Sequence, residues 1–131
     1  MADIAKSGTP SLASVAPPAS SRISGLLAGE DIAAGDACYI KSDGKVWRST
    51  GAAANAAAKV RGYAFVAAKS GEAVTLYFDV NLNYGAGLTP GADYYLSATA
   101  GALADAASVG GTAPVAYAVD ATRIHVMPSR Y

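Results

Sequence analysis

The chain has 131 residues, and its ten basic and ten acidic residues give a formal net charge of zero. This length suits one domain with a substantial core, and a balanced charge without Lys or Arg clusters disfavours binding to nucleic acid or anionic lipid. No stretch approaches the roughly 18 apolar residues of a membrane span, and a single cysteine, Cys38, excludes an internal disulfide and suits a reducing compartment.

Residues 1–29 are rich in Ser, Ala and Gly, hold three of the six prolines and carry only three charged side chains. Such a composition cannot close a core by itself, and it lacks the basic region and apolar stretch of a signal peptide. Two interpretations stay open. The segment is either a flexible tail or an extended arm that becomes ordered by laying its backbone along a partner's sheet edge.

From residue 30 the pattern predicts short strands. Residues 39–41 and 46–49 flank Asp43-Gly44, and an Asp-Gly pair between such runs predicts a hairpin with a two-residue type I′ turn. A second pair of strands is expected at 62–67 and 73–80, joined around Ser70-Gly71. The Ala-rich residues 51–59 between the pairs are too short for a stable isolated helix, so we expect a loop with one helical turn.

The second part of the chain repeats this scheme, with strands expected at 94–97, 102–103, 115–119 and 122–127. The comparison aligns Tyr95 with Tyr39, Leu96 with Ile40 and Leu103 with Val46. It also aligns 116–119 with 62–65 and 124–126 with 74–76. We therefore predict two related four-strand units, at about 30–80 and 86–127.

Eight short strands in two such units predict an all-β fold, a small barrel or sandwich. Residues 30–131 would form this β domain, and residues 1–29 the extended N-terminal arm.

No residue pattern indicates catalysis or metal binding. The one histidine, His125, has no second His or Cys near it in the sequence, and a lone strand histidine is far more often a surface residue. Glu30, Asp31 and Asp36 lie where turn-forming residues are expected at a strand entrance. Residues 85–91 have the wrong spacing for a phosphate loop and precede a strand rather than a helix. We therefore expect no cofactor and no metal.

Aromatic residues offer another possible site. Tyr84, Tyr94 and Tyr95 could stack on a sugar, but Tyr94 and Tyr95 must point to opposite faces of one strand, and aromatic cross-strand pairs commonly stabilise sheets. A structural role is favoured for them. Trp47 belongs to a hairpin strand and fits either a core edge or an interface anchor.

Five segments carry a resemblance, namely residues 61–64, 71–76, 84–97, 101–105 and 113–124. They resemble the small structural proteins of tailed bacteriophages, especially head decoration or capsid cement proteins. The resemblance covers most of residues 30–127.

This resemblance implies a non-enzymatic β domain that binds the major capsid protein on the outside of the shell as a homotrimer and stabilises the capsid. It implies a virion location after synthesis in the host cytoplasm, and no small-molecule substrate. The alternative is a phage fibre or adhesin module that binds a host glycan or protein and presents aromatic side chains near Tyr84. A hydrolase ranks a distant third, because no acid/base set was found.

Under the decoration hypothesis the arm reaches neighbouring shell subunits, aided by aromatic anchors. The predicted interface residues are Pro10, Leu12, Val15, Pro17, Pro18, Arg22, Ile23, Trp47 and Tyr84.

Overall fold

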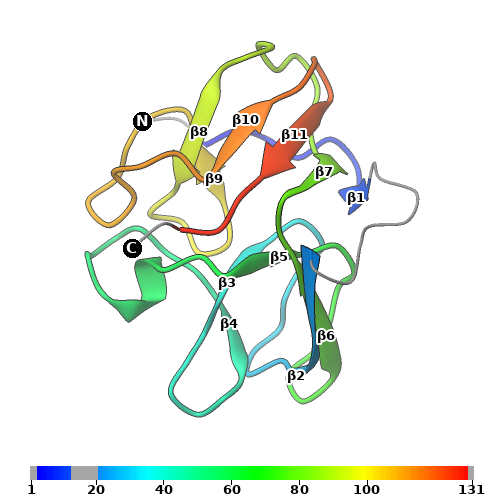
Figure 1. Cartoon of the computed structure of the whole chain (residues 1–131), viewed down its shortest axis with the longest axis vertical. Helices are drawn as coiled ribbons and strands as arrows, with labels where there is room; N and C mark the ends of the chain where they lie inside the picture. Colours follow the sequence, from blue (N-terminus) through cyan, green and yellow to red (C-terminus); the bar gives the residue numbers. More distant parts are fainter. Residues whose placement is uncertain (1–2, 13–20, 130–131) are drawn as a thin grey trace.

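The computed structural model describes residues 3–12 and 21–129, and these residues form an all-β protein with two antiparallel sheets (Figure 1). One three-residue 3-10 helix, η2 (Ala56–Ala58), is the single helical turn expected in the loop at 51–59. The strands are β1 (Ser11–Leu12), β2 (Arg22–Leu27), β3 (Ala37–Ile40), β4 (Val46–Arg48), β5 (Gly62–Ala64), β6 (Ala73–Tyr77), β7 (Val80–Asn83), β8 (Asp93–Leu96), β9 (Leu103–Ala104), β10 (Ala116–Ala118) and β11 (Arg123–Val126).

The two sheets have the same strand order. The lower sheet of Figure 1 runs β2-β6-β5-β3-β4, and the upper sheet runs β1-β7-β11-β10-β8-β9. Without β1, each sheet has five strands that are consecutive in the sequence. In both sheets, the order across the sheet is the first strand, then the fifth, the fourth, the second and the third. The repeating unit therefore has five strands, because β2 and β7 occupy equivalent positions.

The strand registers refine the sequence alignment. Ile40 lies opposite Val46 in the lower sheet, and Leu96 lies opposite Leu103 in the upper sheet, as the alignment of these residues predicts. In the pair formed by the last two strands of each unit, Ala64 of β5 lies opposite Leu76 of β6, and Ala118 of β10 lies opposite Ile124 of β11. Leu76 is thus equivalent to Ile124, whereas the sequence comparison aligned Leu76 with Val126, two residues further along the chain.

The all-β prediction is confirmed, but its barrel alternative is wrong, and so is the count of about eight strands. The strands of each unit pair among themselves, so the sheets end in open edges, and the described residues contain eleven strands. The edges of the lower sheet meet where Ala28 forms a parallel bridge with Val46 and the Gly29 N–H donates to the Val46 carbonyl. Contact between the sheets runs through a shared core that includes Tyr63, Leu82 and Ile124.

The turn after β3 also differs from the prediction. Type I′ geometry needs positive φ at both Asp43 and Gly44, but only Gly44 has it, at φ 80°. The Lys41 N–H donates to the Lys45 carbonyl, which leaves three residues, 42–44, in the loop. A three-residue hairpin loop with glycine in the left-handed region is the next most common solution.

Candidate interaction surfaces

Residues 3–10 form a strap across the domain, which continues into β1. Asp3 bridges to Ala104 in β9, and the Ile4 N–H donates to the Leu103 carbonyl. Further along, the Ser7 N–H donates to the carbonyl of Tyr84, just beyond β7. The chain then reaches β1, which pairs with β7. The strap thus runs from one side of the upper sheet to the other.

The strap is also attached to the lower sheet. Lys6 Nζ lies 2.8 Å from Asp36 Oδ1, whose residue is buried. Pro10 packs on Gly35, where an added Cβ would lie 2.7 Å from Pro10 Cγ. The described part of residues 1–29 therefore lies on its own domain instead of extending away as a detached arm.

The predicted interface residues of the first 29 fall into three groups. Pro10, the last residue of the strap, is buried, and Leu12 lies opposite Leu82 in the β1–β7 pair. Arg22 is exposed in β2, and Ile23 is half-buried beside it. The remaining three, Val15, Pro17 and Pro18, lie outside the described residues.

The two aromatic anchors differ in exposure. Trp47 is half-buried in β4, with Lys41 Nζ 4.3 Å from its ring centroid and its indole N–H donating to Asp43. Tyr84 is only 2% exposed, and burial raises the pKa of its hydroxyl above the usual range. Tyr84 itself therefore cannot belong to the exposed aromatic cluster that the adhesin alternative predicted near it.

Residues 1–29 provide an edge strand to each sheet. β1 is the outer strand of the upper sheet beside β7, and β2 is the outer strand of the lower sheet beside β6. β2 is bulged between Ile23 and Leu26, where Gly25 has φ 79°, and its last residue, Leu27, is 48% exposed. An exposed edge carries backbone groups that another chain can pair with. The sequence signal for β2 is weak, because it consists of the apolar residues that follow Gly25 within a segment rich in Ser, Ala and Gly.

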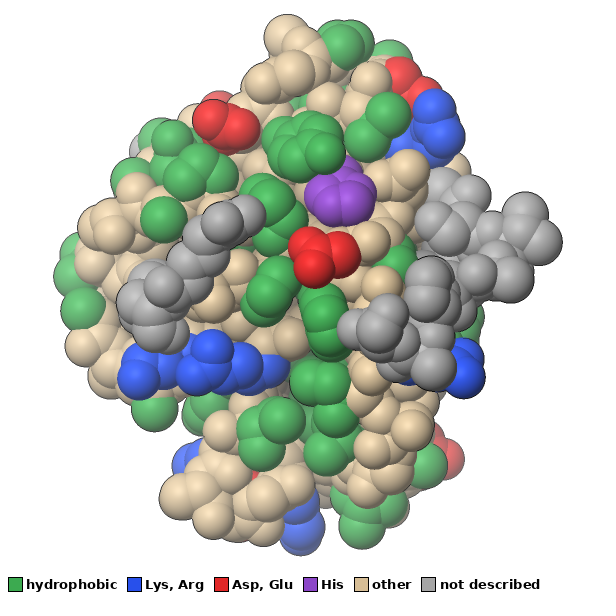
Figure 2. Space-filling view, viewed as in Figure 1, with side chains coloured by type: hydrophobic (Ala, Val, Ile, Leu, Met, Phe, Trp, Pro, Cys, Tyr) green, Lys and Arg blue, Asp and Glu red, His purple; other side chains and the backbone are tan. Residues whose placement is uncertain are grey.

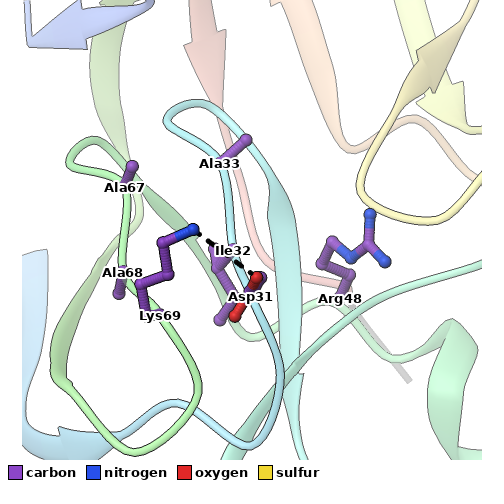
Figure 3. Close-up of a pocket in the computed structure, with 7 residues that line it drawn as sticks. All are labelled: Asp31, Ile32, Ala33, Arg48, Ala67, Ala68 and Lys69. Carbon is purple, nitrogen blue, oxygen red and sulfur yellow. Dashed lines mark ion pairs between the residues drawn. The ribbon is translucent and has the colours of Figure 1, made fainter.

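A hollow of about 440 Å³ lies between the loops that precede β3 and β6 (Figure 3). Its floor contains Ile32 and Ala68, which also form an isolated bridge. Asp31 and Lys69 face each other across it at 3.8 Å, and both are highly exposed. Arg48, also in the lining, pairs with Glu30 at 3.1 Å. The charges around this hollow are thus compensated, which gives it no strong preference for a charged ligand.

The described residues form neither a cluster of metal-binding side chains nor a membrane-spanning helix. Among residues 3–12 and 21–129, no group of three or more His, Cys, Asp or Glu side chains could hold a metal ion. Cys38 is fully buried, and this burial raises the pKa of its thiol far above the usual range. Within the same ranges, no helix has the length and apolar character needed to cross a bilayer.

No protein-family model, curated protein or solved structure matches this chain.

Proposed function

We propose that the chain is a structural protein of a bacteriophage virion, which binds the outer surface of the capsid and stabilises it without catalysing a reaction. The sequence resemblance to head decoration proteins supports this proposal. A neutral two-sheet body suits a protein whose partner is another protein surface rather than nucleic acid or membrane.

The observation that carries the proposal is the position of the N-terminal segment. Residues 1–29 supply β1 and β2, the outer strands on one edge of each sheet, so the proline-rich segment between them starts and ends at sheet edges. Extended backbone at such edges can pair with a strand of a shell subunit. We place the shell contact at β2 and the residues that precede it.

The stabilising mechanism is mass action. A protein that binds only the assembled shell shifts the equilibrium away from disassembly. In a homotrimer with the major capsid protein as partner, three such edges would bind neighbouring subunits together, and linked contacts gain avidity although each one is weak. The many equivalent sites of a shell multiply a small gain per site.

The test uses Leu27→Asp, which places a charge on the exposed end of β2. We expect the variant to fold, because Leu27 is half exposed, and to lose co-sedimentation with undecorated capsid shells. Val109→Asp is the matched control, because Val109 is 71% exposed in the loop after β9 and outside the proposed contact. Light scattering on the same samples reports the oligomeric state.

If Leu27→Asp and the unmodified chain saturate shells with the same affinity, the β2 contact is wrong. Equal loss in both variants would instead indicate a non-specific effect of added charge, and would also contradict the proposed surface.

A further inference from the structure

Four side chains on four adjacent strands form one row across the outer face of the upper sheet. Asp93 of β8 lies opposite Tyr117 of β10, Tyr117 opposite His125 of β11, and His125 opposite Asn81 of β7. The residues that alternate with them along these strands are buried. Because successive side chains of a strand point to opposite faces, the row projects outwards.

The row is internally ordered. Tyr117 is 37% exposed, and its ring stacks on His125 with centroids 5.2 Å apart and an angle of 30°. His125 Nδ1 lies 2.8 Å from Asn81 Oδ1. Since Oδ1 only accepts, this hydrogen bond requires a proton on Nδ1. The histidine, purple in Figure 2, lies on this open face, with apolar side chains on two sides and an acidic side chain directly below it.

The equivalent row of the lower sheet has a different role. There Tyr63 takes the position of Tyr117 and Tyr77 that of His125. Both are buried, and the Tyr63 hydroxyl donates to the Val115 carbonyl at 3.0 Å, which joins the two sheets. Packing in the core thus accounts for a tyrosine at position 63. Tyr117 is exposed, so core packing does not account for a tyrosine there.

We propose that the row of Asp93, Tyr117, His125 and Asn81 binds a neutral oligosaccharide. An exposed tyrosine ring offers an apolar surface to the C–H groups of a sugar ring. The carboxylate, the amide and the imidazole offer acceptors and donors for the hydroxyl groups around it.

The charges of the face favour a neutral ligand. Arg123, two residues before His125 on β11, is the cation that flanks the row, and its Nε lies 2.7 Å from Asp120 Oδ2. Its charge is therefore compensated within the same β10–β11 turn. Asp93 makes the row itself slightly acidic, which disfavours nucleic acid and anionic glycans.

A hollow of about 340 Å³ adjoins the row at Asp93. The lining includes Asp93, Thr89 and Gly87, together with Ile4 of the strap. Ligand sites commonly combine an apolar surface with a few polar groups in a concavity, so a sugar chain on the row can place one unit there.

An extended peptide is a less suitable occupant. β10 and β11 are interior strands whose backbone groups pair on both sides. A peptide therefore could not add a strand here and would gain only side-chain contacts. The inference does not depend on shell binding, because β2 and this face are separate surfaces.

The test is a ¹H–¹⁵N NMR titration of the full chain with cellohexaose, maltohexaose and chitohexaose, up to about 10 mM, which detects millimolar dissociation constants. We expect one of these sugars to shift the signals of Asn81, Asp93, Tyr117 and His125 in a saturable way. No shift with any sugar, or shifts confined to the hollow at Asp31 and Lys69, would overturn the proposal.

Variants identify the contributing groups. Tyr117→Ala and Asn81→Ala should each weaken binding by about tenfold, the loss expected for one stacking or hydrogen-bonding group. Tyr39→Ala, which removes a half-buried tyrosine of the lower sheet, should leave the affinity unchanged. Equal affinity for Tyr117→Ala and the unmodified chain would exclude the row, and capsid co-sedimentation of Tyr117→Ala should remain normal.

Discussion

Lys6 and Asp36 join the strap to the lower sheet through an ion pair of 2.8 Å. The other oxygen of Asp36 accepts the Ala33 N–H at 2.9 Å, and an added Cβ on Gly101 would lie 2.7 Å from the Asp36 Cγ atom. Three segments that are far apart in the sequence therefore meet at one carboxylate: the strap, the loop before β3 and the turn after β8.

Lys6→Met should destabilise the protein, because it leaves the largely buried Asp36 carboxylate without its cation. We expect a loss of about 1–3 kcal/mol in the free energy of unfolding, measured by urea denaturation. Lys69→Met is the matched control, since the Lys69–Asp31 pair is longer and highly exposed and should contribute at most about 0.5 kcal/mol. Equal effects of the two substitutions would show that the strap is not held by this pair.

Gly35→Ala should release the strap. Gly35 has φ 85°, and its new Cβ would meet Pro10 at 2.7 Å, whereas Gly44 has φ 80° and no atom within 4 Å. Both substitutions place an alanine in a left-handed backbone conformation, which costs about 1–2 kcal/mol each. The difference between their free energies of unfolding therefore isolates the clash with Pro10. We expect a greater loss for Gly35→Ala and faster protease cleavage near residue 8. Identical stability and cleavage would mean that Pro10 does not pack there.

Asp120 should make stability depend on pH under acid conditions. Hydrogen bonds from the Thr122 backbone and the Arg123 side chain lower the pKa of Asp120 to about 2, from an ordinary value of 3.8. A lowered pKa in the folded state stabilises the protein above 3.8, and this contribution disappears as the pH falls towards 2. Asp120→Asn should therefore be less stable than the parent chain near neutral pH and approach it at about pH 2. A constant difference in urea midpoint across this range would contradict the assignment.

Cys38 should not react in the folded protein. Its side chain is fully buried, and the raised pKa of its thiol keeps it protonated at neutral pH. A thiol reagent such as dithionitrobenzoate should label the chain only after denaturation in urea. Rapid labelling under native conditions would show that the β3 region opens.

Much of the fold could be predicted from the sequence, because the alternating pattern and the internal similarity are local properties. β3 with β4 and β8 with β9 are examples, since the aligned pairs Ile40–Val46 and Leu96–Leu103 have the same register. The missing strands had weaker signals. β2 lies in a glycine- and serine-rich segment, and β7 was merged with β6 because Asp79, which breaks the strand at φ 54°, is not a residue type that demands this conformation.

The candidate surfaces were harder to predict. The alternation of residues along a strand shows that a sheet has two faces, but not which face packs against the other sheet. Tyr63 and Tyr117 occupy equivalent positions with similar neighbours in the sequence, yet Tyr63 is buried and Tyr117 is exposed. The difference arises from the packing of one sheet on the other, which no local pattern encodes. The burial of Tyr84 has the same origin, since it belongs to the core shared by both sheets.

The measurement that tests the central claim most directly is the thermal stability of undecorated capsid shells with and without the purified chain. Shell opening is followed by the fluorescence of a dye that binds the released DNA. The proposed function predicts saturable binding and an opening temperature that rises with occupancy to a plateau. A chain that stays in the supernatant on sedimentation, or that binds without raising the opening temperature, would contradict a capsid-stabilising role.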